Sequence, residues 1–228
     1  MDYEKLASEY RTIPVAVLHD VLVKAGAPHQ VMSCEIKSAD GLAPFAGPAF
    51  CVRGERVMGG PSTRKDRRFE IYRQIPKGSV LVIASGGQRP GAVLGENMVA
   101  SLRVRGCVGI VTDGGYRDQA AISAMNIPVR AAFVTPISSV GQYNIAELDV
   151  TVALPGQSCS TVFISSGDLV VGDFDGTIVV PRRGLLTILE DCHELMEAEG
   201  RTRQLIMGGE DAEVAYKAND RFGHIRQI

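Results

Sequence analysis

The hydrophobic positions in the central part of the chain predict strands and helices in alternation. The apolar run from Val80 to Ala84 is the strongest strand pattern, and residues 107–111 predict a second, fully buried strand. Between them, Leu94, Met98 and Leu102 recur at four-residue spacing, as on one face of a helix. We therefore expect strand, loop, helix, strand, loop and helix from residue 80 to about 125, and another strand over 128–134.

Amphipathic helices are expected near both ends of the chain. Val15, Leu18, Val21 and Leu22 form an apolar stripe near the N-terminus, which Gly26 and a following proline end. From residue 149 onward, short apolar runs separated by Asp-Gly and Pro-Gly pairs predict β-hairpins or a meander. Helical periodicity returns at residue 185, and this charged C-terminal helix is suited to docking on a partner subunit.

Composition and charge limit the classes of function. With 228 residues and 45% hydrophobic content, the chain suits one well-buried domain with a terminal extension. A net charge of -2 and a pI near 6.1 give no general attraction to nucleic acid or to an anionic membrane. The acidic N-terminus does not fit a signal peptide, and no apolar run reaches the roughly 18 residues of a membrane span. We expect a cytoplasmic protein with no nucleic-acid or membrane partner, whose five cysteines lack any CxxC pair and stay reduced.

The most informative chemistry lies in the loop that follows the 107–111 strand. The guanidinium of Arg117 can clamp a carboxylate or stabilise an enolate oxygen, while the neighbouring Asp118 carboxylate can anchor a divalent cation. The alternative is that Asp118 caps the next helix and Arg117 forms a surface ion pair. Glu96 opens the preceding helix, where the amides of Asn97 and Met98 suit a carboxylate. Because ligands bind beyond the carboxyl ends of parallel strands, both segments are expected at one crevice.

Other polar segments carry weaker patterns. The basic run from Arg64 to Arg68 could hold an acidic substrate, or it could be a solvated helix face or a subunit contact. Asp173 and Asp175 fit turn hydrogen bonding better than metal binding. The four histidines lack HxH and HExxH spacing, and the glycine-rich loop at 85–91 matches neither nucleotide-binding pattern.

Several ordered blocks of the sequence together resemble the RraA-like family. The blocks are Gly47-Pro-Ala, Gly78-Ser-Val-Leu-Val-Ile, Leu94-Gly-Glu, Gly106-Cys-Val-Gly-Ile-Val-Thr-Asp-Gly-Gly-Tyr-Arg-Asp and Gly167-Asp-Leu-Val-Val-Gly-Asp-Phe-Asp-Gly. The resemblance covers about residues 10–182. The family includes class II 4-hydroxy-4-methyl-2-oxoglutarate / 4-carboxy-4-hydroxy-2-oxoadipate aldolases and regulators of ribonuclease E.

The resemblance implies an α/β fold with a layered β-rich core and flanking helices. It implies an RraA-like catalytic domain over residues 1–182 and a C-terminal helical extension over 183–228 that contacts a neighbour in a homotrimer or homohexamer. The active site would then lie at the subunit interface. A further acid, supplied by the neighbouring subunit, would fall near Glu199.

The resemblance also implies roles for the individual site residues. Asp118 would hold Mg²⁺ or Mn²⁺ largely through water, and Arg117 would contact a 2-oxo acid substrate. The turn formed by Gly95, Glu96, Asn97 and Met98 would receive the pyruvyl carboxylate. In the aldolases the position of Glu96 is usually Asp, and the extra methylene shifts any water that the carboxylate orients by about an ångström.

Two functions from different classes are consistent with these residues. The first is a divalent-metal-dependent lyase that cleaves a 4-hydroxy-2-oxo acid by retro-aldol reaction and releases pyruvate, with oxaloacetate decarboxylation as a related activity. Arg117, Glu96 and Asp118 would be its catalytic residues. The second is a non-catalytic protein that binds and inhibits ribonuclease E. Regulators of that type can lack the aspartate of the Arg-Asp pair, which this chain keeps.

Overall fold

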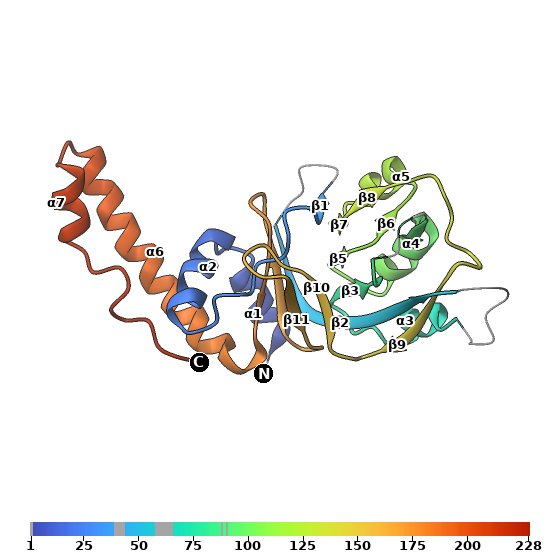
Figure 1. Ribbon diagram of the computed structural model, residues 1–228. Coiled ribbons are helices and arrows are strands. Elements are labelled where there is room, and N and C mark those ends of the chain that lie inside the picture. The colour runs from blue at the N-terminus through green and yellow to red at the C-terminus, as the bar shows by residue number, and fades with distance from the viewer. Residues whose placement is uncertain (1, 39–43, 58–65, 88, 90) are drawn as a thin grey trace.

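A curled β-sheet forms the centre of the computed structural model, which describes residues 2–38, 44–57, 66–87, 89 and 91–228 (Figure 1). The strands pair in the order β1-β7-β5-β3-β2-β12-β13, and β9 pairs with the far end of β2. Arg130 on β7 donates a hydrogen bond to the carbonyl of Asp173, just beyond β12, so strands distant in this order approach each other. Because helices and a mixed sheet alternate along the chain, the α/β class expected from the sequence is confirmed. The strands span Lys37–Ser38 (β1), Phe45–Arg56 (β2), Val80–Ala84 (β3), Gly109–Thr112 (β5), Val129–Ala131 (β7), Tyr143–Leu148 (β9), Leu169–Gly172 (β12) and Thr177–Val180 (β13).

A second, short parallel sheet lies beyond the first and was not expected. Each of the parallel strands β3, β5 and β7 is followed, after a short break, by one strand of this sheet: β4 (Ala92–Leu94), β6 (Gly115–Tyr116) and β8 (Phe133–Val134). Helix α4 (Glu96–Val104) leaves the end of β4, and α5 (Gln119–Ala124) leaves the end of β6. Leu94, expected on the helix, is therefore a strand residue, because its backbone pairs with Tyr116 of β6.

Three groups of helices and hairpins cover the sheets. Helices α1 (Tyr3–Tyr10), α2 (Val15–Lys24) and α6 (Leu185–Met207) share one apolar cluster. Helix α3 (Arg68–Gln74), α4 and α5 share a second. The hairpin of β10 (Val152–Pro155) and β11 (Thr161–Ile164) packs over a third. The predicted N-terminal helix and both predicted hairpins, β10–β11 and β12–β13, are confirmed.

Asp173 has the turn role that the sequence indicated. One carboxylate oxygen accepts the N–H of Asp175 at 2.9 Å, and the other accepts the N–H of Val15 at 2.9 Å, at the start of α2. Both oxygens therefore accept hydrogen bonds from backbone amides.

Within the described ranges, no helix is both long enough and apolar enough to cross a bilayer.

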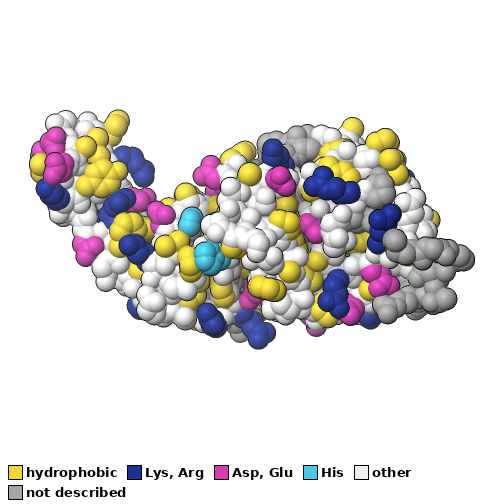
Figure 2. Space-filling model, viewed as in Figure 1, with side chains coloured by type: hydrophobic (Ala, Val, Ile, Leu, Met, Phe, Trp, Pro, Cys, Tyr) yellow, Lys and Arg dark blue, Asp and Glu magenta, His cyan; other side chains and the backbone are white. Residues whose placement is uncertain are grey.

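Helix α6 is anchored along its first half and projects from the body along its second half (Figure 1). Helix α7 (Ala212–Lys217) folds back against the projecting part, where hydrophobic side chains lie beside charged ones at the surface (Figure 2). The C-terminal tail then returns along α6. There the buried Asp191 accepts hydrogen bonds from the backbone N–H and the guanidinium of Arg226 at 2.6–3.0 Å.

Two leucines test the difference between the anchored first half of α6 and its projecting second half. Leu195 is fully buried and Leu205 is 40% exposed. We expect Leu195→Ala to lower the free energy of unfolding by about 2–5 kcal/mol, because it leaves a cavity in the cluster shared with α2. The matched change Leu205→Ala is expected to cost under about 1 kcal/mol. Urea denaturation measures both, and equal losses would contradict the division.

Candidate active site

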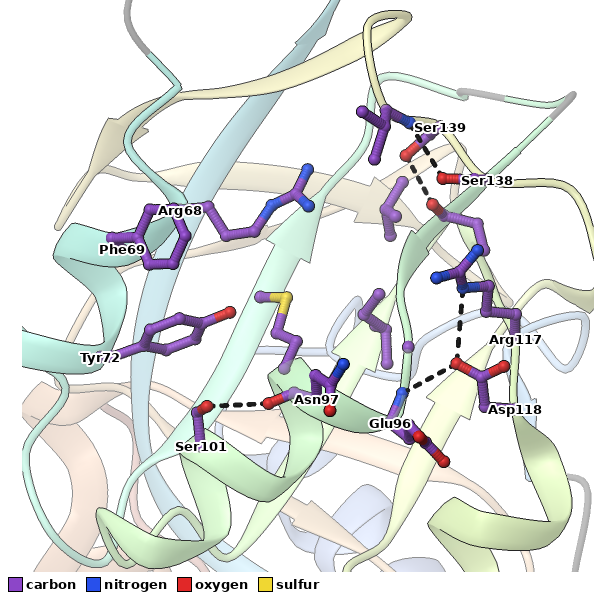
Figure 3. Close-up of a pocket in the computed structure, with 16 residues that line it drawn as sticks. Arg68, Phe69, Tyr72, Glu96, Asn97, Ser101, Arg117, Asp118, Ser138 and Ser139 are labelled. Atoms are coloured by element: carbon purple, nitrogen blue, oxygen red, sulfur yellow. Dashed lines mark hydrogen bonds and ion pairs between the residues drawn. The ribbon is translucent and has the colours of Figure 1, made fainter.

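An open pocket of about 270 Å³ lies where α4 begins (Figure 3). One wall is formed by the end of β4, the first turn of α4 and the turn from β6 into α5. The opposite wall comes from α3, and residues 138–140 form a third side. The predicted segments Gly95 to Met98 and Arg117 to Asp118 both line this pocket, as the strand-end argument from the sequence expected.

The short parallel sheet explains why these two segments meet. Strand β4 pairs with β6, with Leu94 opposite Tyr116, and the N–H of Arg117 donates to the Leu94 carbonyl at 3.1 Å. The residues that follow the two strands therefore emerge side by side. The neighbouring Asp113 ties down the loop after β3, because its carboxylate accepts the N–H of Ser85 at 2.5 Å.

The Asp118 side chain joins the two turns. Its Oδ2 accepts the N–H of Glu96, the first residue of α4, at 3.1 Å, and lies 3.4 Å from Nε of Arg117. Although Asp118 occupies the N-cap position of α5, its side chain makes no capping hydrogen bond there. Its backbone is left-handed (φ 63°), a conformation that aspartate tolerates better than most residues. The carboxylate therefore stabilises the positive end of α4 rather than that of its own helix.

Gly95 leaves the space in which this pair sits. Its backbone is extended (φ -149°) and would accept any residue. A Cβ at this position, however, would lie 2.7 Å from Oδ2 of Asp118 and 3.1 Å from Nε of Arg117. The glycine is therefore required for room rather than for backbone freedom.

The first turn of α4 offers one amide to an anion rather than two. The N–H of Met98 donates to the Gly95 carbonyl at 3.1 Å, whereas the N–H of Asn97 has no acceptor among the residues the structure describes. The Glu96 side chain is exposed at the pocket mouth, and the Met98 side chain is buried.

The α3 wall was not identified as part of the site from the sequence. Arg68 and Tyr72 lie one helical turn apart and line the pocket together with Phe69 (Figure 3). Burial raises the pKa of Tyr72, an effect that the charge of Arg68 opposes, so the phenol stays a hydrogen-bond donor at neutral pH. The only sequence signal for this wall is the basic run that ends at Arg68. Arg64 and Lys65 of that run lie outside the described residues.

The donor set at the pocket suits a hydrated cation and not a closed protein cage. Across the described ranges there is no group of three or more His, Cys, Asp or Glu side chains placed to hold a metal ion. The pocket does present two carboxylates, Glu96 and Asp118, and the Asp118 side chain is 35% exposed. Such sparse oxygen ligands fit Mg²⁺, which keeps most of its water in proteins.

Glu199 does not join the pocket within one chain. It lies on α6, where its carboxylate is 3.3 Å from Nη1 of Arg221. Its expected contact with a neighbouring subunit concerns an assembly and stays a prediction.

The sequence of the chain is similar to that of a known protein family. The model of the RraA-like family, described as Aldolase/RraA, matches residues 15–179. The chain is 30% identical over 175 residues to a Halalkalibacterium halodurans protein named "Putative 4-hydroxy-4-methyl-2-oxoglutarate aldolase", covering 77% of this chain and 76% of that protein.

One further protein is similar in sequence, and another is similar in structure. An "Uncharacterized protein" of Methanocaldococcus jannaschii is 30% identical over 132 residues, which span 58% of this chain and 61% of that protein. The crystal structure of Streptomyces coelicolor RraAS2, titled an unusual member of the RNase ES inhibitor RraA protein family, has the same fold. Its TM-score is 0.77 at 24% identity, covering 88% of this chain and 97% of that one.

Two substitutions test the role of Asp118 in the fold. Asp118→Asn keeps an acceptor for the Glu96 amide and tolerates the left-handed backbone, so we expect it to cost under about 1 kcal/mol of unfolding free energy. Asp118→Ala loses both and is expected to cost about 1–3 kcal/mol. Urea denaturation compares them, and an alanine variant as stable as the asparagine variant would rule out the joining role.

Proposed function

The chain belongs to the RraA-like family, and from this premise we propose that it is a divalent-metal-dependent lyase. The reaction is retro-aldol cleavage of a 4-hydroxy-2-oxo acid with release of pyruvate. The observation that carries the proposal is the convergence of Arg117, Asp118 and the start of α4 on one open pocket. The names of the aldolase relatives support the same class of reaction.

The substrate is anchored by its pyruvyl end. The C1 carboxylate lies at the start of α4, where the Asn97 amide is free among the described residues and the helix dipole favours an anion. The planar guanidinium of Arg117, held at Nε by Asp118, keeps its terminal amino groups for the C2 oxygen. These two contacts fix the end of the substrate at which negative charge develops.

Cleavage breaks the C3–C4 bond. The C4 hydroxyl loses its proton and becomes a carbonyl, and the bonding electrons pass through C3 to the C2 oxygen, where Arg117 stabilises the enolate. Protonation at C3 then gives pyruvate. Glu96, whose side chain is exposed and lines the pocket, supplies and accepts protons through water in this proposal.

Asp118 would hold the divalent cation largely through water, and Glu96 would contact that water. When bound, such a cation acts as a Lewis acid that favours negative charge on the 2-oxo group. Asp118 uses Oδ2 for the Glu96 amide and Arg117, and its other oxygen faces no partner within the described ranges. Decarboxylation of oxaloacetate passes through the same pyruvate enolate, so the same residues support it.

Inhibition of ribonuclease E is the alternative that the sequence left open. That function needs a protein-binding surface and does not use a metal-binding carboxylate. The retained Asp118 and the pocket around it favour catalysis.

Metal dependence gives the direct test. Purified protein is expected to release pyruvate from 4-hydroxy-4-methyl-2-oxoglutarate or oxaloacetate with Mg²⁺ and to lose this activity with EDTA. Asp118→Asn is expected to lower kcat/KM by about 100-fold or more, because the amide is neutral and a poor cation ligand. If neither substrate turns over, or if the variant keeps full activity, the proposal is wrong for these substrates.

Gly95→Ala tests whether the positions of Arg117 and Asp118 matter when their functional groups are unchanged. The added methyl group displaces Arg117 and Asp118 without removing any functional group. A displacement of about 1 Å is expected to lower kcat/KM by about 100-fold. The matched change Gly200→Ala, at a helical position where a Cβ meets no atom within 4 Å, serves as the control. Steady-state kinetics with urea denaturation of both variants tests this, and unchanged kinetics in Gly95→Ala would argue against the assigned positions.

A further inference from the structure

A second arginine faces the pocket from the wall opposite Arg117. Arg68 is the first residue of α3, and its side chain extends into the pocket (Figure 3). Arg117 approaches from the turn after β6. The reaction proposed above gives Arg117 a role at the pyruvyl end and leaves Arg68 without one.

The guanidinium of Arg68 is only partly engaged. One Nη lies 3.4 Å from Oδ2 of Asp66, and Nε is buried with no hydrogen-bond partner among the described residues. The neighbouring Arg67 shows the contrast, because its Nε and Nη2 both donate to Oε2 of Glu70, at 3.0 and 2.8 Å. Arg67 is thus committed to the carboxylate of Glu70, whereas one Nη of Arg68 is its only nitrogen with a carboxylate partner among the described residues.

Asp66 holds Arg68 in place without closing its donor face. The other oxygen of Asp66 accepts the backbone N–H groups of Arg68 at 3.0 Å and Ile145 at 3.2 Å. These bonds fix the carboxylate, and the carboxylate fixes one corner of the guanidinium. Helix α3 is itself anchored by Ile71, which is fully buried. The Arg68 side chain, 24% exposed, is therefore positioned and has little freedom to swing into solvent.

The two arginines lie on opposite walls of the pocket, Arg68 on α3 and Arg117 in the turn after β6. A planar guanidinium suits a carboxylate partner. The Asp66 carboxylate already offsets part of the Arg68 charge, so the fit depends on the placement of the two arginines and not on net charge. A substrate with a carboxylate at each end can contact the start of α4 with one end and Arg68 with the other.

We propose that Arg68 binds the distal carboxylate of a 2-oxo dicarboxylate and thereby selects dicarboxylates over 2-oxo monocarboxylates. This inference rests on the proposed function for the placement of the pyruvyl end. The hydroxyl of Tyr72, one turn further along α3, lies on the same wall and adds a donor. Arg68 acts on substrate choice, and the bond-breaking step belongs to the opposite wall.

Ligand binding without turnover tests the inference. 2-Oxoglutarate and 2-oxopentanoate have equal chain length and differ at the distal end, carboxylate against methyl. Neither carries the 4-hydroxyl group that retro-aldol cleavage needs. Calorimetric titration with Mg²⁺ present is expected to show about 10- to 100-fold tighter binding of 2-oxoglutarate by the wild type, the range for a charged hydrogen bond.

Three variants locate the preference. In Arg68→Gln the two ligands are expected to bind within about twofold of each other, because the distal carboxylate loses its charged partner. Arg68→Lys keeps the charge without the planar fork and is expected to retain part of the preference. Arg67→Gln is the matched control and is expected to keep the wild-type preference. A wild type without preference, or an Arg68→Gln variant that keeps it, overturns the inference.

The outcomes separate this inference from the proposed function. If pyruvate release fails but the preference for 2-oxoglutarate exists and depends on Arg68, the distal site stands and the reaction is wrong. If pyruvate release depends on Mg²⁺ and Asp118 while Arg68→Gln leaves ligand preference unchanged, the reaction stands and the role of Arg68 is wrong.

Discussion

The pocket depends on one hydrogen bond, from the Glu96 amide to the Asp118 carboxylate. Strands β4 and β6 contain three and two residues, so their pairing alone holds the turns that follow them weakly. The bond adds a contact between those turns and places a negative charge at the positive end of α4. The same carboxylate oxygen orients Arg117. A single side chain thus couples the geometry of two strand-turn-helix units, and the empty space at Gly95 makes the contact possible.

Patterns that repeat over several residues were predictable from the sequence, and single contacts were not. Helical spacing identified α2, α4 and α6, and turn residues identified the hairpins. The meeting of the α4 turn with Arg117 and Asp118 followed from the geometry of parallel strands. Strands β4, β6 and β8 are too short to show a period, so Leu94 read as the start of a helix. The α3 wall reaches the pocket through the packing of Ile71, which no local pattern encodes.

Burial perturbs several titratable groups in the core. It raises the pKa of the thiols of Cys51 and Cys192 to about 12, and it raises the pKa of the Tyr10 phenol as well. These groups stay neutral at neutral pH, and the Tyr10 hydroxyl donates a hydrogen bond to the Leu185 carbonyl at 2.6 Å. The carboxylates at the pocket are partly or fully exposed instead. Their chemistry depends on position and on access to water, which suits ligands of a hydrated ion better than a desolvated acid or base.

The left-handed backbone of Asp118 also bears on how this scaffold can change during evolution. Aspartate, asparagine and glycine tolerate that conformation, and most other residues are strained in it. Aspartate and asparagine codons differ by a single base, as do those of aspartate and glycine. A lineage can therefore remove the carboxylate charge from the pocket in one mutational step while keeping a backbone that still folds. Loss of the pocket carboxylate and loss of structure are uncoupled at this position, so the chemistry of the pocket can change while the scaffold is kept.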